Sequence, residues 1–186
     1  MSNLVLPGIG GSGPAHWQSL WQEADTAARR FRPSSWDQPG LSDWISALER
    51  ELEACAGPVV LVAHSLACLL VAHWAEGSAQ VARVAGAFLV APPDPDGADF
   101  PRAQAGSFAP VPTARLPFPA LLVASRDDPY ASIDYARTRA QQWGTGFVDV
   151  GEKGHINAGS GLGAWSEGQG LLAAFRAGLG LAGSGV

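Results

Sequence analysis

Three side chains of the sequence could together carry out nucleophilic catalysis: Ser65, a carboxylate at Asp127 or Asp128, and His155. A serine hydroxyl is a weak nucleophile, and a neighbouring imidazole activates it by accepting its proton. A carboxylate that holds the imidazole in one tautomer also stabilises the imidazolium that forms. These residue types therefore predict acyl transfer through a covalent intermediate on Ser65, provided that the fold brings them together.

Ser65 lies at the junction of a predicted strand and a predicted helix. The apolar run 59–63 is typical of a strand buried on both faces, and an alanine-rich helical segment follows directly, with no Gly, Pro or Asn between them. A strand that turns into a helix around one serine, between small residues, is typical of a nucleophile elbow. Ala63 and Ala67 replace the two glycines of the usual G-x-S-x-G motif. The alternative is an ordinary junction in which Ser65 caps the helix.

The two partners of Ser65 follow later strands of the same predicted sheet. Asp127 and Asp128 come after the strand 120–124, and His155 comes after the strand 147–150. Because ligands of parallel sheets gather at the carboxyl ends of the strands, these side chains are expected to meet at one edge. The chain order serine, acid, histidine is that of the α/β-hydrolases.

Two adjacent carboxylates cannot both point at one imidazole, so one of them must be chosen. Asp128 is favoured because it lies further into the turn, and Asp127 would then pair with Arg126 or face solvent. Asp94 and Asp96 follow the preceding strand and are the less favoured acid positions.

The other three histidines have weaker claims to a chemical role. His64 precedes Ser65, but adjacent side chains on an extended turn point apart, so it is expected to be structural. His73 is expected to pack or face solvent on its helix. His16 could either line the mouth of the site or cap its helix, and the sequence leaves both open.

The glycine-rich loop 7–14 separates the first strand from the first helix. Its glycines lack the G-x-G-x-x-G spacing of a dinucleotide-binding loop, which argues against a Rossmann domain. Such a loop can instead point a backbone N–H group at a developing oxyanion. The predicted donors are the N–H of Leu66 and a second N–H from this loop, at Ile9 or Gly10.

The elements that must position these residues alternate between strand and helix along the whole chain. Continuous apolar strands predict a parallel sheet covered on both sides, that is, a three-layer αβα sandwich in a single domain, 1–186, with a frayed tail at 182–186. The proline-rich segment 91–119 is the only place for a lid and is too short for a large cap domain. The predicted strands are 3–6, 31–36 (an edge strand), 59–63, 84–90, 120–124 and 147–150, and the predicted helices are 16–30, 41–55, 66–76, 132–143 and 167–179.

Composition excludes several other classes of protein. The chain has 186 residues, 47% of them hydrophobic and 16% charged, and its net charge is −5, so we expect a globular protein that does not bind nucleic acid. No apolar run reaches membrane-spanning length, and we expect no signal peptide. Cys55 and Cys68 are expected to be small buried hydrophobes in a reducing compartment, which favours a cytoplasmic location.

Four stretches of the sequence resemble a known family, the retinoblastoma-binding-protein/YdeN-like small serine hydrolases of the α/β-hydrolase superfamily. The resemblance implies Ser65, Asp128 and His155 as the catalytic triad and Ile9 as the oxyanion position, with no cofactor or metal. Interaction with a regulatory protein is associated with the mammalian branch of the family, but no residue here identifies a binding motif for it, so a protein partner stays unknown. The stretches are Pro7-Gly8 with Gly13 to Gln18, Val62 to Ala67, Ala124 to Tyr130, and Gly154 to Ala158 with Gly163 to Trp165.

The resulting hypothesis is an esterase-like serine hydrolase acting on a small ester or amide; a thioesterase or peptidase remains open. Four residues that flank the catalytic loops are candidates to line its pocket: His16, Trp17, Tyr130 and Trp165. The alternative for the three aromatic residues is packing in the core, which is the commoner fate of a tryptophan. The alternative is a binding module that keeps the fold but turns over little, since fold does not fix function.

Overall fold

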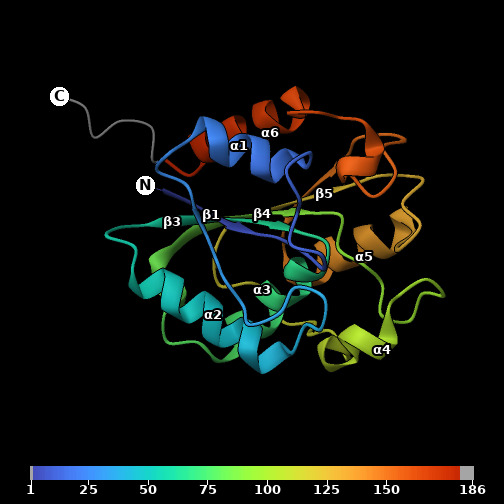
Figure 1. The fold of residues 1–186 in the computed structure, drawn as a ribbon, viewed down its shortest axis with the longest axis horizontal. Coiled ribbons are helices and arrows are strands. Elements are labelled where there is room, and N and C mark those ends of the chain that lie inside the picture. Colours follow the sequence, from blue (N-terminus) through green and yellow to red (C-terminus); the bar gives the residue numbers. More distant parts are fainter. Residues whose placement is uncertain (1, 181–186) are drawn as a thin grey trace.

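The computed structural model describes residues 2–180, and the tail predicted to fray, 182–186, lies outside this range. Within it, six strands form one parallel sheet in the order β2-β1-β3-β4-β5-β6 (Figure 1). The predicted parallel sheet is therefore confirmed. The strands are β1 (Ser2–Leu6), β2 (Arg29–Arg30), β3 (Val59–His64), β4 (Val84–Val90), β5 (Ala120–Ala124) and β6 (Gly146–Asp149).

Helices cover both faces of the sheet, which confirms the three-layer αβα sandwich. Helices α1 and α6 lie on one face, and α2, α3 and α5 lie on the other (Figure 1). The helices are α1 (Trp17–Ala24), α2 (Leu41–Glu53), α3 (Leu66–Gly77), α4 (Arg102–Ala105), α5 (Ile133–Trp143) and α6 (Ser166–Gly178), with short 3-10 helices η1 (Val81–Arg83), η2 (Gly106–Phe108) and η3 (Ala158–Ser160). No helix within residues 2–180 has the length and apolar character needed to cross a membrane.

Strand β3 contacts both of the hydrophobic cores that lie on the two faces of the sheet. Its side chains alternate between the two cores: Leu61 and Ala63 contact the core under α2 and α3, whereas Val60 and Val62 contact the core under α1 and α6. All of them are buried, and complete burial of each valine or leucine side chain contributes about 1.5–3 kcal/mol. The strand is thereby fixed from both sides, and so is the residue that follows it.

The first crossover differs from the sequence prediction. Helix α1 ends at Ala24 rather than near Arg30, and the edge strand is Arg29–Arg30 rather than 31–36. The chain turns at Asp25, whose side chain accepts a hydrogen bond from the Ala27 N–H at 3.0 Å. It can then pair with β1 before Pro33, which has no N–H to donate to a sheet.

The segment 91–119 carries more structure than the sequence indicated. It contains α4 and η2, neither of which was predicted, and no large cap domain. Ala105 and Phe108 are completely buried and anchor the segment to the core under α2 and α3. Cys55 and Cys68 are both buried, unpaired thiols.

Candidate active site

Ser65 occupies a strained turn between β3 and α3. Its backbone angles, φ 56° and ψ −127°, lie in a region that non-glycine residues rarely adopt and that costs about 1–3 kcal/mol. Two backbone hydrogen bonds hold the turn: the Ser65 N–H donates to the Val90 carbonyl and the Cys68 N–H donates to the Ser65 carbonyl, each at 2.9 Å. The strain lifts a partly exposed Ser65 to the carboxyl edge of the sheet, as in a nucleophile elbow.

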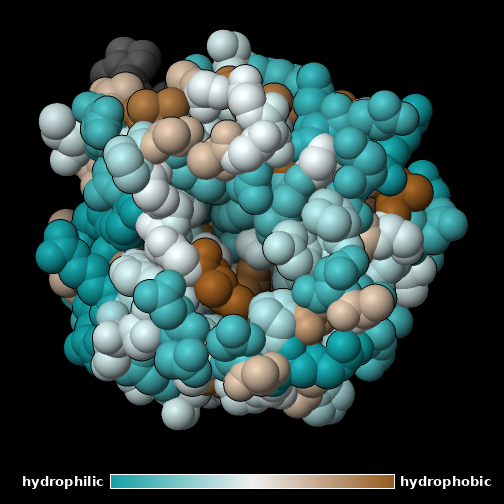
Figure 2. Space-filling model, turned by 45° about the vertical axis from the view of Figure 1, so that its right-hand side comes forward, coloured by the Kyte–Doolittle hydropathy of each residue, from teal (hydrophilic) through white to brown (hydrophobic). Residues whose placement is uncertain are grey.

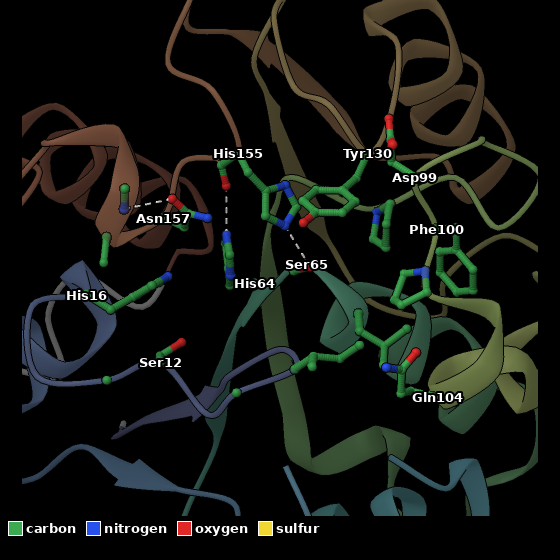
Figure 3. Close-up of a pocket in the computed structure, with 18 residues that line it drawn as sticks. Ser12, His16, His64, Ser65, Asp99, Phe100, Gln104, Tyr130, His155 and Asn157 are labelled. Carbon is green, nitrogen blue, oxygen red and sulfur yellow. Dashed lines mark hydrogen bonds between the residues drawn. The ribbon is translucent and has the colours of Figure 1, made fainter. Parts of the chain in front are cut away.

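Ser65, His155 and Asp128 form a continuous hydrogen-bonded chain across the ends of three strands. The Oγ of Ser65 lies 2.8 Å from His155 Nε2 (Figure 3). On the other side of the ring, His155 Nδ1 lies 2.9 Å from both carboxylate oxygens of Asp128. A carboxylate only accepts, so Nδ1 carries the proton and Nε2 is free to accept the Ser65 proton. The side chains of His155 and Asp128 are only 8% and 3% exposed, so little water competes for these bonds.

Asp127 makes different contacts from its neighbour Asp128. Its Oδ1 accepts hydrogen bonds from the Ser125 hydroxyl at 2.7 Å and from the Gly154 N–H at 2.8 Å. These bonds lower the pKa of Asp127, the Ser125 bond more than the Gly154 bond. Asp127 does not pair with Arg126, which instead forms an ion pair with Asp149. It therefore holds the backbone beside His155 rather than the imidazole.

The glycine-rich loop touches the elbow directly at Gly8. A Cβ atom at Gly8 would lie 2.9 Å from the Cβ of Ser65, a distance that side chains do not tolerate. Within residues 2–180 the N–H groups of Ile9 and Leu66 have no hydrogen-bond partner, whereas the Gly10 N–H donates to the Trp36 carbonyl at 3.2 Å. Of the two loop positions that the sequence left open, only Ile9 keeps an available donor.

His16 both caps its helix and lines the cavity, the two roles that the sequence left open. Its Nδ1 accepts a hydrogen bond from the Gln18 N–H at 3.2 Å and so caps α1, while its ring lines the cavity beside Ser65. The pKa of His16 is lowered to about 4, mainly by burial, and also by the positive charge of Arg30 and by the nearby His155.

Two other histidines bond to backbone carbonyls. His64 is buried, and its Nε2 donates to the His155 carbonyl at 2.9 Å. Burial holds the pKa of His64 well below its ordinary value, and His155 and His16 add to the effect. His73 contacts the Phe108 carbonyl from α3, away from Ser65.

A cavity of about 430 Å³ opens at the Ser65–His155 pair. Figure 2 shows a hollow in this part of the surface with hydrophobic atoms at its edge, and Ile9, which lines the cavity, is the exposed large hydrophobic residue of the described chain. Tyr130, a predicted pocket residue, is at the wall, with its ring centroid 4.5 Å from that of His155. Among residues 2–180 no group of three or more His, Cys, Asp or Glu side chains is arranged to hold a metal ion.

The prediction that Trp17 and Trp165 line the pocket was wrong. Both are almost completely buried, and their ring centroids lie 5.2 Å apart in the core under α1 and α6. The Trp17 indole N–H donates to the Ile156 carbonyl at 2.8 Å, so it supports the loop that carries His155 from behind. Nearness in sequence to a catalytic loop does not determine which way a large side chain turns.

The sequence missed part of the cavity wall. Phe100, Pro101 and Gln104, all from the segment 91–119, line it. Figure 3 shows Phe100 and Gln104 opposite Ser12, His16 and Asn157. Proline content marked that segment as a possible lid, but no periodicity indicated which of its side chains would face Ser65.

Comparison with known proteins shows the family and the fold of the chain. The model of a family described as serine hydrolase matches residues 3–174. A structure from Pectobacterium atrosepticum described as a YdeN-like hydrolase is 36% identical, with a TM-score of 0.84 over 96% of this chain and 92% of that chain. The ydeN gene product of Bacillus subtilis is 20% identical, with a TM-score of 0.74 over 95% and 98% of the two chains. An esterase domain from Rhodothermus marinus is 19% identical, with a TM-score of 0.67 over 94% and 86%.

The fold and the family match define the class of protein: the chain belongs to the serine hydrolase family and has a compact α/β-hydrolase fold. Within that class, it is a small hydrolase of the YdeN-like family, as the sequence resemblance indicated. No curated protein gives a significant match.

Proposed function

We propose that the protein hydrolyses a small ester or amide through an acyl-enzyme on Ser65. The observation that carries this proposal is the unbroken chain from Ser65 Oγ to His155 and Asp128, with heavy-atom distances of 2.8 and 2.9 Å. His155 takes the Ser65 proton as the hydroxyl attacks the acyl carbonyl, and then gives it to the leaving group. Water, activated by the same imidazole, releases the acid and restores Ser65.

The tetrahedral intermediate needs fixed donors for its negative oxygen. The Ile9 and Leu66 N–H groups fit this role because they flank Ser65 and have no partner within residues 2–180. The Leu66 N–H also belongs to the first turn of α3, where the helix dipole favours negative charge. Loss of one such donor costs other hydrolases about 10²–10³ in rate, so this part of the site carries much of the proposed catalysis.

The cavity supports a small substrate. A volume of about 430 Å³ must hold both the acyl and the leaving group, which leaves little room for a long acyl chain. Its walls mix apolar contacts from Leu66, Phe100 and Tyr130 with polar ones from Ser12 and Asn157. Such a mixture suits a short acyl group joined to a moderately polar partner.

A fluorophosphonate probe tests the proposal directly. Wild-type protein is expected to react at Ser65 with loss of fluoride, and Ser65→Ala is expected to lose all labelling. Ser166→Ala, on α6 and outside the cavity, is the matched control and should label like wild type. A folded wild-type protein that takes up no label would refute the proposal and favour a binding module. If Ser65 is labelled, a screen over short acyl esters, thioesters and amides would rank the substrates.

A further inference from the structure

Two buried histidines adjoin the proposed triad without belonging to it. His64 is the last residue of β3, and its side chain is in contact with the backbone of His155 rather than with Ser65. Its Nε2 lies 2.9 Å from the His155 carbonyl oxygen. Because a carbonyl oxygen only accepts, the proton of His64 must be on Nε2, and its Nδ1 is a bare acceptor.

The tautomer of His16 follows from the same reasoning. Its Nδ1 accepts the Gln18 N–H at the start of α1, so its proton is also on Nε2. That Nε2 is buried and has no hydrogen-bond partner within residues 2–180. The two rings meet edge-on, with centroids 4.7 Å apart, and Figure 3 shows a ring nitrogen of His16 directed at His64. An N–H group packed against an imidazole in this way is weakly attractive.

We propose that His16 and His64 form a relay of two neutral, Nε2-protonated imidazoles that positions the backbone of His155 for catalysis. The relay runs in one direction, from the Gln18 N–H through His16 and then His64 to the His155 carbonyl. It rests on the proposed function, because it acts only through His155. His16 and His64 are thus positioning residues, and neither touches the substrate's reacting atoms.

The surroundings of the pair keep both rings neutral. The charged or titratable groups that face them are Arg30 behind His16, His155 beside both, and Asp128 on the far side of His155. Burial is the largest cause of the low pKa of each ring. A second proton would have to go to Nδ1, where on His16 it would oppose the Gln18 N–H. The imidazolium that forms on His155 during turnover therefore meets no second cation.

NMR of protein labelled with ¹⁵N-histidine tests the relay without any loss of structure. The chain has four histidines, so the signals can be assigned with single variants such as His73→Gln. His16 and His64 are expected to show neutral Nε2–H tautomers throughout pH 5.5–8. A Nδ1–H tautomer, or a titration of either ring within that range, would overturn the proposal.

Kinetics of matched variants give the second test. His64→Gln keeps a side-chain donor for the His155 carbonyl, whereas His64→Leu removes it. We expect kcat to fall about tenfold in His64→Leu with little change in KM, and His64→Gln to recover most of the loss. Equal losses in both variants would mean that bulk, not the hydrogen bond, matters, and would overturn the relay.

The contribution of His16 can be separated from its role as a helix cap. Asn is a good N-cap residue, so His16→Asn keeps the cap but removes the N–H directed at His64. A fall in kcat of about threefold is expected, with the thermal midpoint near that of wild type and His73→Gln as the control. An unchanged kcat would remove His16 from the relay. Failure of wild type to label at Ser65 would instead refute the hydrolase itself.

Discussion

The two sides of the cavity are built in different ways. The histidine side, formed by Ser12, His16, His64 and Asn157, is fixed by hydrogen bonds to backbone or buried side chains at every one of these residues. The proline-rich side, formed by Pro93, Asp99, Phe100, Pro101 and Gln104, has, in the described part of the chain, hydrogen bonds only on its backbone: the Tyr135 hydroxyl donates to the Pro93 carbonyl at 3.1 Å, and the Gln104 N–H donates to the Pro101 carbonyl at 3.0 Å. Within residues 2–180 the side chains of Asp99 and Gln104 have no hydrogen-bond partner. Figure 3 shows the two sides facing each other across Ser65.

This difference separates two tasks that one site must perform. Acyl transfer requires donors and acceptors fixed within a fraction of an ångström, and hydrogen bonds to strand ends supply such precision. Choice of substrate requires only shape and charge, which a packed segment can supply and which can vary without loss of chemistry. Substitutions near the triad and the histidine side should therefore change the rate for every substrate, and those on the proline-rich side should change the order of substrates.

The largest expected effect is the difference in activity between substitutions of the adjacent acids Asp128 and Asp127. Asp128→Asn is expected to lower kcat/KM about 10⁴-fold on any ester, because an amide can present its NH₂ to His155 and favour the wrong tautomer. Asp127→Asn keeps an acceptor for the Gly154 N–H and is expected to lose less than tenfold. The measurement is steady-state hydrolysis of one activated ester by both variants, with thermal melts to verify folding. A larger loss in Asp127→Asn would reverse the assignment of the acid.

Gly8→Ala tests the oxyanion loop, with an effect of intermediate size. The new Cβ would lie 2.9 Å from the Ser65 Cβ and 3.1 Å from the His64 carbonyl oxygen, so the loop that carries the Ile9 N–H must move away. We expect kcat to fall about 10²-fold for all substrates, measured with a panel of short esters. Gly57→Ala is the control, because no heavy atom lies within 4 Å of a Cβ there. Similar kcat values for the two variants would argue against Ile9 as a donor.

The sequence predicted that Ser65, Asp128 and His155 would meet at one edge of the sheet, because parallel sheets leave few choices. Strand ends are marked by continuous apolar runs, and in a parallel sheet they meet at one edge, so Ser65, Asp128 and His155 were placed by position alone. The choice of Asp128 over Asp127 rested on the turn, and the structure gives the two acids separate partners. Local pattern was enough here because Ser65 directly follows its strand, and Asp128 and His155 lie in the loops that come immediately after theirs.

The cavity walls could not be predicted in the same way. Trp17 and Trp165 flank catalytic loops in sequence, yet both turn into the core because each can bury a large apolar ring there. Phe100 lines the cavity from a segment that is anchored to the core under α2 and α3 by Phe100 itself, Ala105 and Phe108. That docking depends on contacts distant in sequence, and no periodicity in the segment 91–119 records it. The predicted first helix was too long for a related reason. The pairing of Arg29–Arg30 with β1 depends on contacts distant in sequence, and it requires α1 to end early.

Asp99→Asn tests the proline-rich side and should have a smaller, selective effect. Asp99 is the only carboxylate among the described residues that line the cavity, and it is exposed at the wall. Its removal is expected to lower kcat/KM for a cationic ester about three- to fivefold relative to its neutral isostere at low ionic strength. The ratio should return toward one as salt screens the charge. An equal change for both esters would indicate that Asp99 acts on the chemistry instead.

The histidine side and the proline-rich side should also differ in how they affect the pH dependence of the free energy of unfolding. In the folded protein the pKa of His16 is about 4, against an ordinary value of 6.5, and that of His64 is also lowered, so the unfolded chain binds more protons below pH 6.5. The free energy of unfolding should thus fall as the pH drops from 6.5 towards 4, by at most about 1.4 kcal/mol per pH unit for each histidine.

Urea unfolding at several pH values between 7.5 and 4.5 measures this slope. His16→Asn is expected to reduce the slope by up to about 1.4 kcal/mol per pH unit, which corresponds to the uptake of one proton. Asp99→Asn, on the proline-rich side, should leave the slope unchanged. Asp43, Asp127 and Asp149 have lowered pKa values, so the stability they contribute is lost only as the pH falls through and below their ordinary value of 3.8, outside this window. A slope in His16→Asn as steep as that of wild type would mean that the proton uptake arises elsewhere, with His64 as the next ring to replace.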